Sequence, residues 1–226
     1  MKNLFKIVTV LVLALGIAGC GSKNNLDAKE GSIEGPIATI VVKDYGTMTF
    51  QLFDDVPNTV KNFVSLANQG YYNGLTFHRL VKDFMIQGGD PEGTGMGGPG
   101  YSIKGEFNKN KVLNTHKHHK GAIAMARSSD NDSAGSQFYI VFNEQACQSL
   151  EGNYAVFGQL LSGEDVLDKL NKAPLMAADP TTGKTSEQPE PQIIIESITV
   201  DTKGVEYGEP EKIVDCNLKV YTKELI

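Results

Sequence analysis

The sequence predicts a mainly β protein, either a closed antiparallel barrel or a sandwich, with only two α-helices. Two observations lead to this fold class. Short runs of β-branched and aromatic residues recur along the chain with glycine-rich connections between them, and only two segments show helical periodicity. The chain has 226 residues, of which 40% are hydrophobic and 21% charged. This composition is typical of one globular domain with appendages.

The first predicted elements are a hairpin and a helix. Residues 37–42 form a β-branched run, residues 43–46 a turn, and residues 47–53 alternate polar and apolar side chains. Pro57 suits the first turn of the helix and Gly70 its end. Between them, apolar residues recur at helical spacing, namely Val60, Phe63, Val64 and Ala67.

The remaining elements are short strands and one short helix. The expected strands are 76–80, 84–87, 122–126, 137–142, 155–160 and 193–200. The second helix fits residues 164–171. Residues 173–191 contain four prolines and few large apolar groups, which predicts an exposed loop.

The net charge is mildly acidic. The chain carries 21 Lys and Arg against 27 Asp and Glu, a formal charge of −6. A broad electrostatic surface for nucleic acid or anionic lipid is therefore not expected.

The N-terminus is typical of an export signal. Lys2 and Lys6 form a positive region, residues 7–15 are apolar, and small residues follow. The segment is too short and wrongly flanked for a typical membrane-spanning helix. Residues 17–20 (IAGC) resemble the lipobox of bacterial lipoproteins. A plain secretory peptide or an uncleaved anchor is the alternative.

The lipobox resemblance implies that residues 1–19 are removed and that a lipid is attached to the Cys20 thiol. Residues 20–35 are polar and punctuated by glycine, which predicts a flexible tether to the folded domain. The mature chain is then expected on the extracytoplasmic face of the cell membrane. In that compartment Cys147 and Cys216 could form a disulfide, but the sequence does not give the distance between them.

Two generic motifs lack the context that their chemistry requires. Residues 93–98 fit the G-x-G-x-x-G pattern of dinucleotide-binding loops, but the Pro-Gly pair that follows disfavours the necessary helix. Ser136 does not lie in the G-x-S-x-G sequence of a hydrolase nucleophile.

Three histidines, His116, His118 and His119, suggest a metal site at first sight. No Cys or carboxylate stands at ligand spacing beside them, so a solvated basic loop is favoured. We therefore expect neither a cofactor nor a metal.

Two blocks carry specific chemistry: FHRLVKDFMIQGGDP at 77–91 and GAIAMARSSDNDSAGSQFYI at 121–140. With the later VFG at 156–158, they resemble the cyclophilin family of peptidyl-prolyl cis-trans isomerases, in family order and at nearly family spacing. The resemblance runs from about residue 37 to residue 200.

The resemblance implies a closed antiparallel eight-stranded barrel capped by two α-helices, with the isomerase domain at 36–201 and a charged tail at 202–226. It also implies that Arg79 is the catalytic residue. The substrate-binding residues it implies are Phe84, Met85, Phe138, Tyr139 and Leu150 at or beside the proline pocket, Tyr154 in the pocket wall, Gln87 and Gln137 as polar contacts, and the backbone of Ala126 and Arg127. His78 is expected to pack or to form internal hydrogen bonds rather than to transfer protons.

These residue types suit the reaction physically. Rotation about an Xaa-Pro bond breaks amide resonance, against a barrier of roughly 18–20 kcal/mol, and no covalent bond has to be made. A catalyst needs only to favour the twisted state, in which the prolyl nitrogen becomes pyramidal and basic. A guanidinium can donate to that nitrogen while an apolar cup holds the pyrrolidine ring. Proline-containing peptides of exported client proteins are the expected partners, and the chain is expected to be a monomer.

The chain departs from the best-known members at several positions. Arg127 and Ser128 replace an Asn-Ala pair, and Tyr139 and Tyr154 replace a phenylalanine and a histidine. Ser149 stands at the tryptophan position that helps bind cyclosporin, so weakened cyclosporin affinity is expected. The main alternative function is a non-catalytic chaperone module that holds proline segments in the same cup. An exported solute-binding lipoprotein is a weaker alternative, because such proteins are usually larger two-lobed α/β proteins.

Overall fold

The computed structural model describes residues 35–214. The predicted signal segment, Cys20, most of the tether and Cys216 lie outside the described residues. The helices are α1 (Pro57–Asn68) and α2 (Glu164–Asn171), with two short 3-10 helices, η1 (Asn108–Asn110) and η2 (Gln148–Leu150). The strands are β1 (Ile37–Val42), β2 (Gly46–Leu52), β3 (Thr76–Phe77), β4 (Arg79–Val81), β5 (Met85–Gly88), β6 (Ala122–Met125), β7 (Phe138–Val141), β8 (Val156–Ser162) and β9 (Ile193–Asp201). None of the helices in this part of the chain is long and apolar enough to span a membrane.

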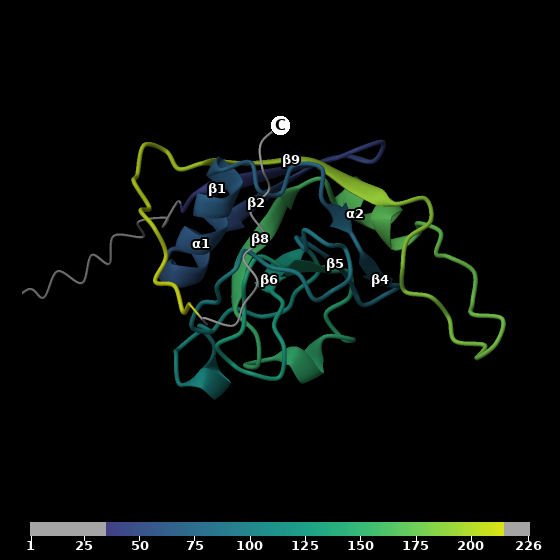
Figure 1. Ribbon diagram of the computed structural model, residues 1–226. Helices are drawn as coiled ribbons and strands as arrows, with labels where there is room; N and C mark the ends of the chain where they lie inside the picture. The colour runs from purple at the N-terminus through teal and green to yellow at the C-terminus, as the bar shows by residue number, and fades with distance from the viewer. Residues whose placement is uncertain (1–34, 215–226) are drawn as a thin grey trace, which may run out of the picture. The chain divides into compact units, whose positions relative to one another are not determined.

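The strands form a nearly closed antiparallel barrel (Figure 1). Their order in the sheet is β3-β9-β1-β2-β8-β6-β7-β5-β4. The mainly β class with two α-helices is thus confirmed, while the described sheet has nine strands rather than the eight expected. The extra strand arises because the predicted strand 76–80 is divided at His78. Thr76 pairs with Ile194 of β9, whereas Arg79 pairs with Gln87 of β5. β3 and β4 therefore stand at the two ends of the sheet although one residue separates them in the chain.

Two strands near the β4 end of the sheet, β5 and β7, have buried residues on both faces. In β5, Ile86 points into the main core inside the barrel, while its neighbour Met85 belongs to a second apolar cluster. In β7, Ile140 and Val141 divide in the same way. Because neighbouring side chains of a strand point to opposite faces, the second cluster lies on the outer face of the barrel.

The helices lie on opposite sides of the barrel (Figure 1). The apolar face of α1 joins the main core, where the Phe63 ring packs against Phe138 and Phe157 at centroid distances of 5.6 and 5.2 Å. Val56, the residue before α1, has no side chain that can cap the first turn of the helix. The buried Glu106 does so from a distant loop, because its carboxylate accepts the amides of Asn58 and Thr59 at 3.2 and 2.7 Å. A carboxylate at this end also complements the helix dipole.

The described part of the predicted charged tail, residues 202–214, packs along α1; we call it the C-terminal strap. The Asn58 side chain donates to the Glu211 carbonyl at 3.1 Å and accepts the Glu211 amide at 2.7 Å. Tyr207 donates to Asp54 at 2.6 Å, and Ile213 forms a β-bridge with Ser102. The strap thereby ties residues 202–214 to α1 and to the loops beside it.

The predicted loop 173–191 is exposed over most of its length, but it is also docked. Its two arms pair through the amide of Met176 on the Gln188 carbonyl and the amide of Glu190 on the Pro174 carbonyl, at 2.9 and 3.1 Å. The Leu80 amide of β4 donates to the Glu187 carbonyl at 2.6 Å. We call residues 174–190 the edge hairpin, because it covers the side of β4 that does not pair with β5.

Candidate active site

The candidate site lies on the outer face of β4, β5 and β7. Arg79 opens β4 directly after the break at His78, and its side chain is 40% exposed. Its strand partner Gln87 lies on the same outer face, since their neighbours Leu80 and Ile86 point into the main core. The barrel thus brings a cation and an amide side by side at its surface.

A row of hydrogen bonds leads from this cation into a glycine-rich loop. Arg79 Nη1 lies 3.4 Å from Gln87 Oε1, a long contact, and Gln87 Nε2 donates to Gln137 Oε1 at 2.8 Å. Gln137 Nε2 in turn donates to the carbonyls of Gly95 and Gly97 at 3.0 and 2.9 Å. The three predicted polar residues therefore form one connected row.

Asp90 shapes the loop that ends this row. It is 1% exposed, and its carboxylate accepts the amides of Glu92, Thr94 and Gly95 at 2.8, 3.0 and 2.5 Å. A Cβ at Gly97 would overlap this carboxylate. The G-x-G-x-x-G pattern at 93–98 thus serves a tight loop around a buried acid, and no helix opens there. Sequence reasoning did not assign Asp90 this role.

Hydrogen bonds inside the barrel fix the turn at residues 135–137, which carries Gln137. Ser136 is fully buried, and its hydroxyl donates to the Gly89 carbonyl at 2.7 Å. The Tyr72 hydroxyl donates to the Ser136 carbonyl at 3.2 Å. Ser136 is therefore a structural residue of the turn.

An apolar cup adjoins the polar row. Met85 and Tyr139 are 2% and 4% exposed and belong to the outer cluster. The Tyr139 and Tyr154 rings meet edge to face at 5.8 Å between centroids. The other predicted pocket residues, all partly exposed, pack against the same cluster: Phe84, Ala126, Leu150 and Tyr154. The structure thus brings together every predicted pocket residue except Phe138.

Phe138 is the exception, because the structure contradicts its predicted contact with the substrate. It is completely buried in the main core, where its ring meets Phe63, Tyr72 and Phe77 edge to face. Its neighbour Tyr139 points outward, because successive residues of β7 face opposite sides. Phe138 supports the barrel and is not accessible to a peptide on the outer surface.

The Arg127 side chain is used within the protein. Its Nε and Nη2 both donate to the Asn153 carbonyl, at 3.0 and 2.9 Å. The guanidinium carbon lies 4.7 Å from the Tyr154 ring centroid and 5.0 Å from that of Phe107. Such cation–π contacts favour a fixed guanidinium position. The side chain therefore holds the pocket wall, and the expected substrate contact falls to the backbone.

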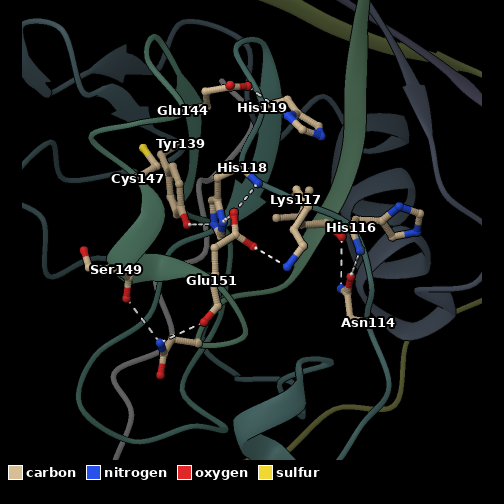
Figure 2. Close-up of polar contacts among 12 residues, drawn as sticks. Asn114, His116, Lys117, His118, His119, Tyr139, Glu144, Cys147, Ser149 and Glu151 are labelled. Atoms are coloured by element: carbon tan, nitrogen blue, oxygen red, sulfur yellow. Dashed lines mark hydrogen bonds and ion pairs between the residues drawn. The ribbon is translucent and has the colours of Figure 1, made fainter.

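A polar network around the buried His118 adjoins Tyr139 of the cup (Figure 2). His118 Nε2 is 2.8 Å from the Tyr139 hydroxyl, and the His118 amide donates to Glu151 at 2.9 Å. Glu151 also pairs with Lys117 at 3.5 Å. The His118 side chain is fully buried, so the prediction of a solvated basic loop is wrong for this histidine. It holds for His119, which is exposed and pairs with Glu144.

Burial shifts the pKa values of His118 and Tyr139, whereas a hydrogen bond and nearby charge decide the direction for Glu151. Burial lowers the pKa of His118, which is therefore neutral, and raises the pKa of Tyr139 well above its usual value. Burial alone would raise the pKa of Glu151, but the His118 amide bond and the charge of Lys117 lower it overall. His118 Nδ1 lies 3.5 Å from Glu151 Oε1 but forms no hydrogen bond within residues 35–214. The contact of His118 Nε2 with the Tyr139 hydroxyl holds the phenol ring in the cup.

No metal or thiol chemistry is indicated among residues 35–214. No group of three or more His, Cys, Asp or Glu residues is arranged to hold a metal in this part of the chain. Cys147 is a buried free thiol, and burial raises its pKa to about 11. A thiol that stays protonated is a poor nucleophile.

The site therefore combines an accessible guanidinium, a row of amides and an apolar cup, without a nucleophile. This arrangement on an antiparallel barrel suits a class of proteins that act on a bound ligand through position and electrostatics.

Comparison with known proteins identifies the class more closely. Residues 37–200 match the model of the family described as cyclophilin type peptidyl-prolyl cis-trans isomerase/CLD. A peptidyl-prolyl cis-trans isomerase of Helicobacter pylori strain J99 is 40% identical over 153 residues, 66% of this chain and 90% of the relative. The isomerase B of Bacillus subtilis is 42% identical over 137 residues, 60% of this chain and 91% of that protein.

A solved structure agrees. The cyclophilin type isomerase of Cryptosporidium parvum, crystallised in the presence of the dipeptide Ala-Pro, has a TM-score of 0.62 and 33% identity and covers 73% of this chain and 98% of its own. The chain belongs to the cyclophilin-type peptidyl-prolyl cis-trans isomerase family and is an isomerase of Xaa-Pro bonds.

The buried histidine makes folding stability depend on pH. The unfolded chain takes up a proton near the ordinary histidine pKa of about 6.5, whereas folded His118 resists it. The free energy of unfolding should therefore reach its full value above that pH. Below it, the free energy of unfolding should fall by at most about 1.4 kcal/mol per pH unit for this one histidine. The double variant His118→Phe, Tyr139→Phe should show a shallower fall in urea denaturation between about pH 7 and pH 5.

The single variant Tyr139→Phe, which keeps the buried histidine, is the control and should retain the slope. Part of the slope should remain even in the double variant, because burial also lowers the pKa of His78. Equal slopes in all three proteins would contradict this origin.

Proposed function

We propose that Arg79 stabilises the twisted state of the Xaa-Pro bond while the apolar cup holds the proline ring. As the bond rotates, the prolyl nitrogen gains a lone pair, and a guanidinium N–H donates to it. A guanidinium suits this task because it stays charged and has five donors in a rigid plane. The observation that carries the proposal is the placement of a half-exposed Arg79 at one end of the Gln87–Gln137 row.

The cup and the row have separate tasks in this proposal. Met85, Phe84 and Tyr139 offer an apolar surface that suits a pyrrolidine ring. Gln87 and Gln137 fix the polar edge against which the peptide lies. The Cryptosporidium parvum isomerase, whose crystal structure was obtained in the presence of the dipeptide Ala-Pro, supports proline-containing peptides as ligands.

Substitution of Arg79 tests this role. Arg79→Ala should lower kcat/KM for cis-trans exchange of an Ala-Pro peptide by roughly 10²–10³-fold, the usual loss when one transition-state donor is removed. Lys82→Ala, which removes an exposed cation three residues away, is the matched control and should leave the rate unchanged. Equal rates for wild type and Arg79→Ala would reject the role and favour a binding module without catalysis.

We also propose that the isomerase works outside the cytoplasm, on exported proteins that fold near the membrane. The support is the N-terminal sequence: a positive start, an apolar run and the lipobox-like IAGC that ends at Cys20. A polar tether of about fifteen residues would let the domain reach its clients from a lipid anchor.

Cys20→Ser tests the anchor. A thiol is needed for lipid attachment, so the variant should move from the membrane fraction to the soluble fraction when cells are fractionated, with unchanged isomerase activity. Retention in the membrane fraction would show that another part of the chain anchors it.

Weak cyclosporin binding is a third expectation. Ser149 is exposed in η2, close to the cup residue Leu150, and offers no large ring to an apolar inhibitor. Ser149→Trp should tighten cyclosporin about tenfold in an inhibition titration, since a buried aromatic contact contributes at least about 1.4 kcal/mol. Tight stoichiometric inhibition of the wild type would contradict the expectation.

A further inference from the structure

Glu187 of the edge hairpin forms the shortest contact of the proposed catalytic arginine. Arg79 Nε donates to Glu187 Oε2 at 2.6 Å, whereas the Nη1 contact with Gln87 is 3.4 Å long. The two residues lie 108 positions apart in the sequence. The carboxylate comes from a segment whose sequence predicts only an exposed loop.

The backbone fixes the carboxylate in place. The Leu80 amide, directly after Arg79, donates to the Glu187 carbonyl at 2.6 Å. The hairpin is itself held together by the Leu175–Pro189 bridge, and Pro189 is buried. Arg79 and Glu187 thus adjoin like a cross-strand pair, so that little conformational freedom of the backbone remains to be lost when their side chains meet.

The geometry of the contact leaves the guanidinium able to act. The carboxylate takes the Nε–H, and the contacts within residues 35–214 leave the Nη2 group unused. Since the guanidinium is planar and rigid, fixing its Nε–H restricts the direction in which the Nη donors point. A carboxylate that bound the Nη groups in a fork would instead consume the donors that a substrate needs.

Stability is a poor explanation for this pair. The two side chains are 40% and 50% exposed, and exposed ion pairs contribute little to folding. Orientation is a better one, because an unrestrained arginine side chain samples many rotamers and a misplacement of about 1 Å can lower a rate by up to about 10²-fold.

We propose that Glu187 is a positioning residue that orients the Arg79 guanidinium for its action on the prolyl nitrogen, and that the edge hairpin thereby contributes this one side chain to the active site. This inference rests on the role proposed for Arg79. It assigns a function to a segment beyond the sequence blocks that carry the family resemblance.

Three variants of the full chain test the inference. Glu187→Ala should lower kcat for Ala-Pro exchange roughly tenfold with little change in KM, because the interaction matters only in the transition state. Glu187→Gln keeps an acceptor oxygen at the same reach without the charge, so its rate should lie between those of Glu187→Ala and wild type. Glu190→Gln removes a carboxylate from the same hairpin that does not contact Arg79 and should match wild type.

A spectroscopic measurement separates orientation from a general loss of structure. The Nε–Hε resonance of Arg79 in a nitrogen–proton NMR spectrum should be distinct and protected from solvent exchange in wild type and Glu190→Gln. It should lose that protection in Glu187→Ala, while the thermal midpoint shifts by less than about 4 °C.

The outcomes distinguish this inference from the proposed function. Unchanged or increased kcat in Glu187→Ala, with Arg79→Ala inactive, would overturn the positioning role alone. Equal losses in Glu187→Gln and Glu187→Ala would also overturn it, since charge rather than orientation would then be the cause. Full activity of Arg79→Ala would overturn both the role of Arg79 and the inference built on it.

Discussion

The closure of the barrel at His78 is the constraint on which the rest of the structure depends. β3 pairs with β9 and β4 pairs with β5, so a single residue joins the two ends of a nine-stranded sheet. The residue that begins the second half of this junction is Arg79. Its position against Gln87 is therefore set by the hydrogen bonds that close the barrel, and no flexible loop lies between the fold and the guanidinium.

The second organising feature is that strands near this junction are buried on both faces. Ile86 and Phe138 fill the interior, while their neighbours Met85 and Tyr139 form the cup outside. Folding and the proposed peptide binding therefore use alternate residues of the same strands. The buried acids extend this division of labour: Asp90 shapes the glycine loop and Glu106 caps α1, and neither faces the apolar cup.

Much of this arrangement follows from the sequence, but long-range contacts do not. The hairpin 37–53 and the helix 164–171 were predicted with nearly correct bounds, because their periodicity and turn residues are local signals. The site residues follow from a family resemblance. That resemblance does not tell which of Phe138 and Tyr139 faces the outer surface, because this depends on the orientation of the strand β7. The roles of His118 and Glu187 do not follow from the sequence. His118 lies in a basic segment and Glu187 in a polar segment with prolines, and neither segment indicates the distant partners Tyr139 and Arg79.

The C-terminal strap bears on the order in which the chain folds. Asn58 and Glu211 are 153 residues apart in the sequence, and the first strand, β1, pairs with the last, β9. Contacts of such separation form late, since the chain between them must first be closed into a loop. During synthesis the N-terminal residues appear first. The barrel therefore cannot close, and the strap cannot cover α1, until residues up to about 211 have been synthesised. β1 and α1 thus remain without these partners through most of synthesis.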